Sequence, residues 1–124
     1  ITCVSVGNPH CVVFDDYIGR LDLKKVGPVF EHAPIFPDRV NTEFVRFVNK
    51  RTLKVRVWER GIGETMACGT GACAVAVAAV INGICSKNNE ITIQAKGGKL
   101  KVQWNKNNNV YLIPNFSIGS GECF

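Results

Sequence analysis

Twelve consecutive small or apolar residues constrain the fold more than any other part of the chain. Residues 70–81 contain no proline, and five of them are alanine, the best helix former. A helix of this composition has no polar face, so we expect it to be buried on most sides. Asn82-Gly83 predicts its C-terminal end, because glycine readily adopts the left-handed conformation that terminates helices. The remaining chain therefore has to enclose this helix.

Alternating apolar and polar residues predict the strands that enclose it. They lie at residues 2–6, 10–14, 41–48, 53–57, 90–95, 99–104 and 110–113, with a hairpin turn at Gly97-Gly98. Residues 22–31 have helical spacing after Asp22, a candidate N-cap, although Gly27-Pro28 weakens or interrupts the pattern. His32 is expected in a solvated loop. The fold class predicted for residues 1–124 is a single α+β domain, a largely antiparallel curved sheet wrapped around a central buried helix.

Composition excludes several classes of function. The net charge is +5, but the lysines are spread along turns and strand ends, which is a weak signal for a nucleic-acid partner. The longest apolar helix is too short to span a bilayer and no export signal is present, so we expect a cytoplasmic protein away from membranes. Six cysteines form no Cys-x-x-Cys pair and there are only two histidines, so we expect free thiols and no zinc site. A chain that enters a strand at Ile1 suggests a partner segment on its N-terminal side.

Cys68 is the candidate reactive centre because it lies at the start of the alanine-rich helix. The first N–H groups of a helix have no intrahelical partner, and the positive end of the helix dipole lowers the pKa of a nearby thiol. Gly69 and Gly71 leave room for a ligand carboxylate beside the sulfur. A thiolate next to an anion-binding turn can act as a base toward carbon acids. The alternative is that Cys68 is a small buried hydrophobe, which is our interpretation of Cys73.

Polar residues cluster at the strand ends near this helix. The hairpin of residues 41–57 should bring Asn41, where its first strand begins, close to Glu59-Arg60, just beyond its second strand. Asn8 precedes a proline, which holds it in an extended or turn conformation and aims its amide out of the loop. The alternatives are an exposed salt-bridged pair at Glu59-Arg60 and an ordinary turn residue at Asn8.

Three motifs together resemble one enzyme family. The sequences Val-Trp-Glu-Arg-Gly at 57–61 and Ala-Cys-Gly-Thr-Gly-Ala-Cys-Ala at 67–74 closely resemble the second catalytic motif of diaminopimelate epimerases, cofactor-independent enzymes of lysine and peptidoglycan-precursor synthesis. Gly-Asn-Pro-His-Cys-Val-Val at 7–13 and Asn-Thr-Glu-Phe-Val at 41–45 follow the family's order and approximate spacing. The resemblance covers about residues 1 to 112, and residues 114–124 depart from the family pattern.

The resemblance implies a mechanism and a partner. In this family two similar domains face each other, and the chain resembles the C-terminal one. An isomerase of this kind interconverts LL- and meso-diaminopimelate: one cysteine removes the α-proton and a second cysteine, from the absent N-terminal domain, returns it on the other face. The implied catalytic residues are Cys68, His10 and Glu59, and the implied substrate-binding residues are Asn8, Asn41, Glu59, Arg60, Gly69 and Thr70. The chain alone is expected to be inactive, and a homodimer is possible.

Alternative functions differ in their use of the thiol. A related proline or hydroxyproline racemase would also use two thiols, but residues 41–44 and Glu59-Arg60 fit diaminopimelate better. A related isomerase with a carboxylate base would lack Cys68. A binding or redox domain with a reactive thiol would need no second domain.

Overall fold

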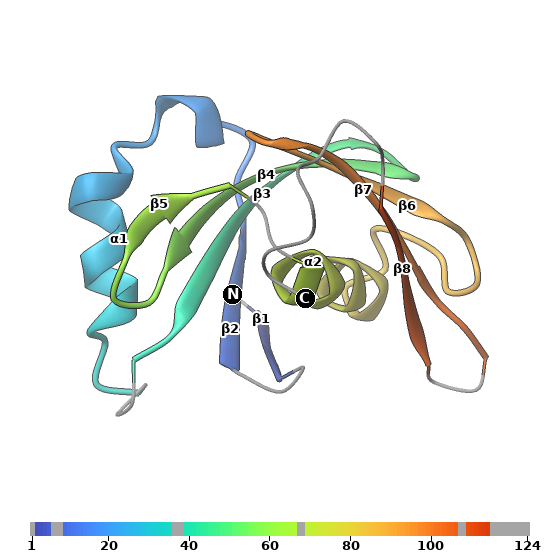
Figure 1. The fold of residues 1–124 in the computed structure, drawn as a ribbon, viewed down its shortest axis with the longest axis horizontal. Coiled ribbons are helices and arrows are strands. Elements are labelled where there is room, and N and C mark those ends of the chain that lie inside the picture. The colour runs from blue at the N-terminus through green and yellow to red at the C-terminus, as the bar shows by residue number, and fades with distance from the viewer. Residues whose placement is uncertain (1, 6–8, 36–38, 67–68, 107–108, 115–124) are drawn as a thin grey trace.

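A curved sheet arches around one central helix in the computed structural model (Figure 1). The structure describes residues 2–5, 9–35, 39–66, 69–106 and 109–114. The strands are β1 (Thr2–Ser5), β2 (Pro9–Phe14), β3 (Asn41–Asn49), β4 (Thr52–Glu59), β5 (Gly63–Thr65), β6 (Ile91–Ala95), β7 (Gly98–Trp104) and β8 (Val110–Pro114). The helices are α1 (Leu23–Glu31) and α2 (Gly69–Ile81), with a 3-10 turn, η1, at Ile18–Arg20.

The sheet is mixed, with antiparallel pairs in the majority. The strand order is β1-β2-β3-β4-β6-β7-β8, and β5 pairs separately with β4. Two pairs are parallel: β2 with β3, joined through α1, and β4 with β6, joined through α2. Parallel neighbours need a long crossover, and helices are its usual form. The predicted α+β fold with a largely antiparallel curved sheet around a buried helix is thus confirmed.

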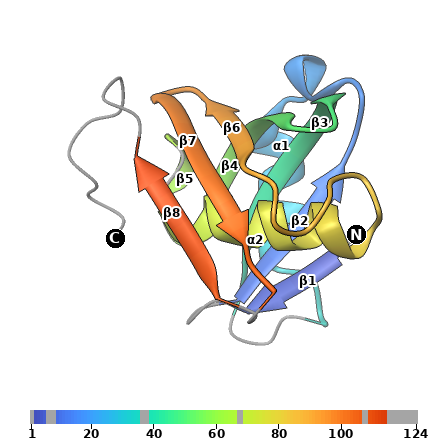
Figure 2. The ribbon, with the colours of Figure 1, turned by 90° about the vertical axis from the view of Figure 1, so that its right-hand side faces the viewer.

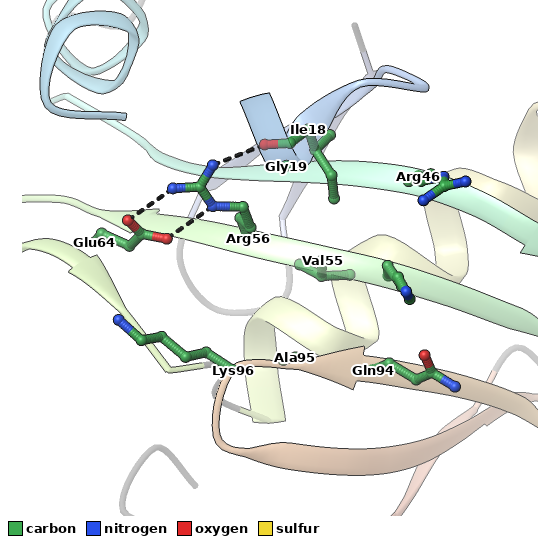
Figure 3. Close-up of a pocket in the computed structure, with 10 residues that line it drawn as sticks. Ile18, Gly19, Arg46, Val55, Arg56, Glu64, Gln94, Ala95 and Lys96 are labelled. Carbon is green, nitrogen blue, oxygen red and sulfur yellow. Dashed lines mark hydrogen bonds and ion pairs between the residues drawn. The ribbon is translucent and has the colours of Figure 1, made fainter. Parts of the chain in front are cut away.

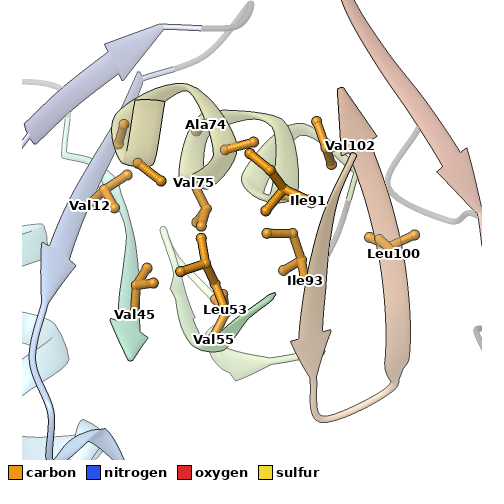
Figure 4. Close-up of a cluster of buried hydrophobic side chains, with 14 of the residues drawn as sticks. Val12, Val45, Leu53, Val55, Ala74, Val75, Ile91, Ile93, Leu100 and Val102 are labelled. Atoms are coloured by element: carbon orange, nitrogen blue, oxygen red, sulfur yellow. The ribbon is translucent and has the colours of Figure 1, made fainter. Parts of the chain in front are cut away.

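Helix α2 forms the centre of the core. It lies across the concave face of the sheet and contacts β1, β2, β3, β6, β7 and β8 (Figure 2). Nine of its thirteen residues are buried, and aliphatic side chains from five strands surround it (Figure 4): Val12, Val45, Leu53, Val55, Ile91, Ile93, Leu100 and Val102. The helix ends as predicted, since Gly83 has a φ of 74° and the Ile84 N–H donates to the Ala79 carbonyl at 2.9 Å.

Helix α1 packs on the opposite face of β3 and β4. The prediction that Gly27-Pro28 could interrupt it was wrong, because the helix runs continuously from Leu23 to Glu31. Trp58 explains the glycine: a Cβ atom on Gly27 would lie 2.1 Å from the Trp58 indole. The predicted N-cap, Asp22, occupies the cap position but makes no side-chain cap hydrogen bond. Tertiary contact with Trp58 therefore outweighs the local cost of the Gly-Pro pair.

Two further expectations can be compared with the structure. The predicted turn at Gly97-Gly98 was placed one residue too late: Ala95 pairs with Gly98, so Lys96 and Gly97 form the turn and Gly98 starts β7 with a φ of 138°. His32 has an exposed side chain, as predicted. Neither helix of the described residues is long and apolar enough to cross a membrane.

Candidate active site

Three strand ends meet at one edge of the sheet. His10 of β2 pairs in register with Asn41 at the start of β3, and Thr42 pairs with Trp58 near the end of β4. The Arg60 N–H donates to the Asn41 side-chain oxygen at 2.8 Å. The predicted convergence of Asn41 with Glu59-Arg60 is confirmed, and Asn41 also holds the backbone of the turn after β4.

The polar residues of this edge continue the face of the sheet that packs on α2. Side chains alternate along a strand. Val12, Val45 and Val57 belong to the core around α2. His10, Glu43 and Glu59 lie two residues from them along the same strands, toward the edge, and therefore share their face. A buried apolar surface thus passes directly into a polar one.

A buried His-Glu pair forms the centre of the polar edge. The Nδ1 atom of His10 lies 2.9 Å from both carboxylate oxygens of Glu43, and both side chains are almost inaccessible to solvent. Burial raises the pKa of Glu43, His10 lowers it by hydrogen bonding and by its charge, and the Glu59 carboxylate raises it further. Because Nδ1 contacts Glu43, Nε2 is the ring atom through which His10 can interact with a second group.

Glu43 received no role in the sequence analysis. It was quoted only as part of the motif at 41–45, although a glutamate within a strand that enters the core is rarely buried without a partner. His10 lies 33 residues earlier in the chain and is the partner in the structure. Pairing these two residues from sequence would have required the parallel register of β2 and β3.

Glu31, at the end of α1, holds the turn that carries Arg60. Its carboxylate accepts hydrogen bonds from the Trp58 indole at 2.8 Å, from Arg39 at 3.2 Å and from the Gly61 N–H at 3.2 Å. Burial alone would raise the pKa of Glu31, but these hydrogen bonds outweigh it and lower the pKa. Together Asn41 and Glu31 fix two consecutive backbone N–H groups, those of Arg60 and Gly61. The sequence analysis assigned no role to Glu31, the last residue of the segment that it predicted to be helical.

The start of α2 lies within reach of this edge. β5 pairs with the last residues of β4, and only residues 66–68 separate it from Gly69. Gly69 and Gly71 are buried and Thr70 is partly buried. Cys68 and Asn8 lie outside the described residues, so their predicted roles are not tested by the geometry.

Four of the six cysteines lie within the described residues. Cys3, Cys11, Cys73 and Cys85 form no disulfide bond, as expected. Burial raises the pKa of Cys11 to about 11 and also raises the pKa of Cys85. Cys73 is partly rather than fully buried and packs against the core. Within the described residues, no three His, Cys, Asp or Glu side chains are placed to hold a metal ion together.

Comparison with known proteins identifies the family of the chain. The family model described as diaminopimelate epimerase matches residues 2–117. The chain is 51% identical to a diaminopimelate epimerase from Acetivibrio thermocellus over 98% of the chain and 44% of the relative, and 49% identical to one from Desulfovibrio desulfuricans over 100% and 43%. It therefore spans less than half the length of the curated relatives it matches.

Solved structures agree on the fold. A phenazine biosynthesis protein of the PhzF family from Bacillus anthracis superposes with a TM-score of 0.61 at 25% identity, over 86% of this chain and 34% of that one. A structure titled as a predicted epimerase from Pseudomonas aeruginosa has a TM-score of 0.59 at 20% identity, over 86% and 38%. By its family-model match and its half-identical relatives, the chain belongs to the diaminopimelate epimerase family.

Proposed function

We propose that the chain supplies one half of the active site of a cytoplasmic, cofactor-independent epimerase that interconverts LL- and meso-diaminopimelate. Its partner in this site is an N-terminal epimerase domain that carries the second cysteine. Curated relatives named diaminopimelate epimerase support the activity. The observation that carries the proposal is the polar edge, where His10, Asn41 and Arg60, all assigned to the site from sequence, lie together.

Cys68 is the acid/base in this mechanism. Its thiolate takes the α-proton from one face of the substrate and becomes a thiol, while the second cysteine thiol gives a proton to the opposite face and becomes a thiolate. The proton count is unchanged, and the configuration inverts. The roles of the two cysteines exchange in the reverse direction.

The remaining residues stabilise and position the reacting groups. The α-proton of an amino acid is very weakly acidic, so the negative charge that develops on the substrate carboxylate must be stabilised as the proton leaves. The N–H groups of Gly69 and Thr70 supply that stabilisation from the start of α2. Glu59 and Arg60 bind the substrate, Asn8 and Asn41 complete the polar lining, and His10 and Glu59 tune the thiol.

Glu43 extends this assignment as a positioning residue. Its contacts with Nδ1 fix the orientation of the His10 ring, so that Nε2 faces the group that His10 serves. This is the usual way in which a buried carboxylate selects one tautomer of a functional histidine.

A reconstitution assay tests the proposal. Conversion of LL- to meso-diaminopimelate is measured with the chain alone, with an added N-terminal domain, and with Cys68→Ala in the same mixture. The proposal predicts no inversion by the chain alone, turnover in the mixture, and loss of turnover with Cys68→Ala. Inversion by the chain alone would disprove the two-thiol mechanism, and equal turnover with and without Cys68 would remove this residue from it. Proline offered to the same mixture should not be inverted.

A further inference from the structure

A cavity lies away from the candidate active site, on the outer face of the sheet. It measures about 560 Å³, within the range of small-molecule sites, and Arg46, Lys54, Arg56, Glu64, Gln94 and Lys96 are among its lining residues (Figure 3). None of these residues belongs to the polar edge described above. We call this cavity the outer groove.

A fork in the sheet creates the outer groove. β4 pairs with β6 up to Lys54, opposite Gln94, and pairs with β5 only from Val57 onward. Val55 and Arg56 lie between the two pairings, where β5 and β6 diverge from β4. The hollow therefore follows from the topology of the sheet.

Arg56 is already occupied by structural contacts. Its guanidinium donates to both carboxylate oxygens of Glu64 at 2.9 and 3.0 Å and to the carbonyls of Ile18 and Leu21 at 2.7 and 2.8 Å. The hydrogen bonds from Arg56 lower the pKa of Glu64, and the positive charge of Lys96 lowers it further. Glu64, the one carboxylate among the lining residues, is thus already paired with Arg56.

Two cations at the other end lack an acidic partner. Arg46 and Lys54 stand directly opposite each other across β3 and β4, and Lys54 is opposite Gln94 of β6. In the described part of the chain, no salt bridge joins Arg46 or Lys54 to a carboxylate. Like charges directly opposite on neighbouring strands are unfavourable, and an anion between them removes this cost. The lysines are spread along turns and strand ends in the sequence, and the strand register places Lys54 beside Arg46.

We propose that the outer groove binds a small molecule with at least two negative charges. One carboxylate or phosphoryl group lies between Arg46 and Lys54 and accepts a hydrogen bond from the Gln94 amide, and a second lies toward Lys96. The basic side chains account for the preference for anions, and the cavity volume limits the ligand to a metabolite-sized molecule. This site is separate from the epimerase activity and does not require it.

Titration followed by NMR tests the outer groove. The ¹⁵N-labelled chain is titrated at constant ionic strength with pyrophosphate and, separately, with citrate, so that the two experiments distinguish phosphoryl from carboxylate ligands. We expect chemical-shift changes concentrated at Lys54, Val55, Gln94 and Lys96. Lys54→Gln should raise the Kd by about tenfold, the effect of losing one charge-assisted contact. Arg46→Gln should raise it similarly.

Lys25→Gln is the matched control. Lys25 is exposed on α1 and is not among the residues that line the groove, and its substitution removes the same charge. It should leave the Kd within about twofold of that of the unchanged chain. The proposal is overturned if Lys25→Gln weakens binding as much as Lys54→Gln, if the shifts spread over all lysines, or if neither anion binds at about 10 mM, where a millimolar site would be nearly saturated.

Discussion

The core around α2 and the polar edge beside it are two parts of one sheet face, and different interactions hold them together. The core consists of aliphatic side chains that contribute through buried area, and each can be exchanged for another of similar volume at small cost. The edge contains His10, Asn41 and Glu43, each buried against a defined partner, and Glu31 of α1 supports the turn after β4. In the core, chemical type and volume matter. At the edge, the individual pairing matters.

A charge in the core should have the largest effect. Ala76 is completely buried in α2, so Ala76→Asp places a carboxylate among aliphatic side chains without a partner. We expect a loss of several kcal/mol, enough to unfold a domain of ordinary stability. Thermal unfolding followed by circular dichroism measures it. A soluble Ala76→Asp chain that still melts cooperatively would show that α2 is not enclosed as described.

Gly27→Ala should have the next largest effect, because it disrupts the contact that links α1 to the polar edge. The new Cβ would lie 2.1 Å from the Trp58 indole, so Trp58 must move and lose its hydrogen bond to Glu31. We expect a loss of about 2 kcal/mol, despite the higher helix propensity of alanine. Urea denaturation followed by tryptophan fluorescence measures this loss. Gly19→Ala is the control, since nothing lies within 4 Å of its Cβ position, and it should change stability by less than about 0.5 kcal/mol. Equal effects of both substitutions would refute the packing explanation.

Glu31→Gln preserves shape and removes the charge that three donors contact. We expect a loss of about 2 kcal/mol at neutral pH, the value typical of hydrogen bonds to a charged group. Because the folded-state pKa of Glu31 is below its ordinary value of 4.5, the carboxylate contributes stability above that value which is lost as the pH falls through the folded-state pKa. Urea denaturation between pH 3 and 7 should therefore show that the free energy of unfolding falls less steeply toward acid pH for Glu31→Gln than for the unchanged chain. An equally steep fall would contradict the assignment.

Glu43→Gln should have the smallest effect and the opposite pH dependence. Burial raises the pKa of Glu43, so the folded chain binds this proton more readily than the unfolded chain. Its contribution to stability is present below pH 4.5 and declines as the pH rises through the folded-state pKa. The glutamine amide oxygen can still accept from Nδ1 of His10, so we expect a cost below about 1 kcal/mol at pH 7. The same denaturation series measures it, and a cost exceeding that of Glu31→Gln would contradict this interpretation.

The core could be predicted from sequence because its information is local. The run of alanine and valine in α2, the alternation in β4 and the glycine after Asn82 each indicate a conformation within a few residues. Asn41 and Arg60 could also be brought together, since one hairpin joins them. Local pattern and short connections were sufficient for these features.

The edge and the outer groove could not be predicted in the same way, because their partners are distant in sequence. Glu31 accepts from Trp58, 27 residues later, and His10 contacts Glu43 across a parallel pair. The parallel pairing of β4 with β6 was not predicted either, and it places Lys54 and Gln94 at the fork. A one-residue error in register would separate each of these pairs.

Reactivity of the individual cysteines tests the central claim, that Cys68 is the reactive thiol, most directly. The chain is treated briefly with iodoacetamide near neutral pH, and each cysteine is quantified by peptide mapping. We predict that Cys68 is alkylated first, ahead of Cys3 and Cys73, and that Cys11 and Cys85 react last because burial raises the pKa of both. Alkylation of Cys11 or Cys73 before Cys68 would contradict the account.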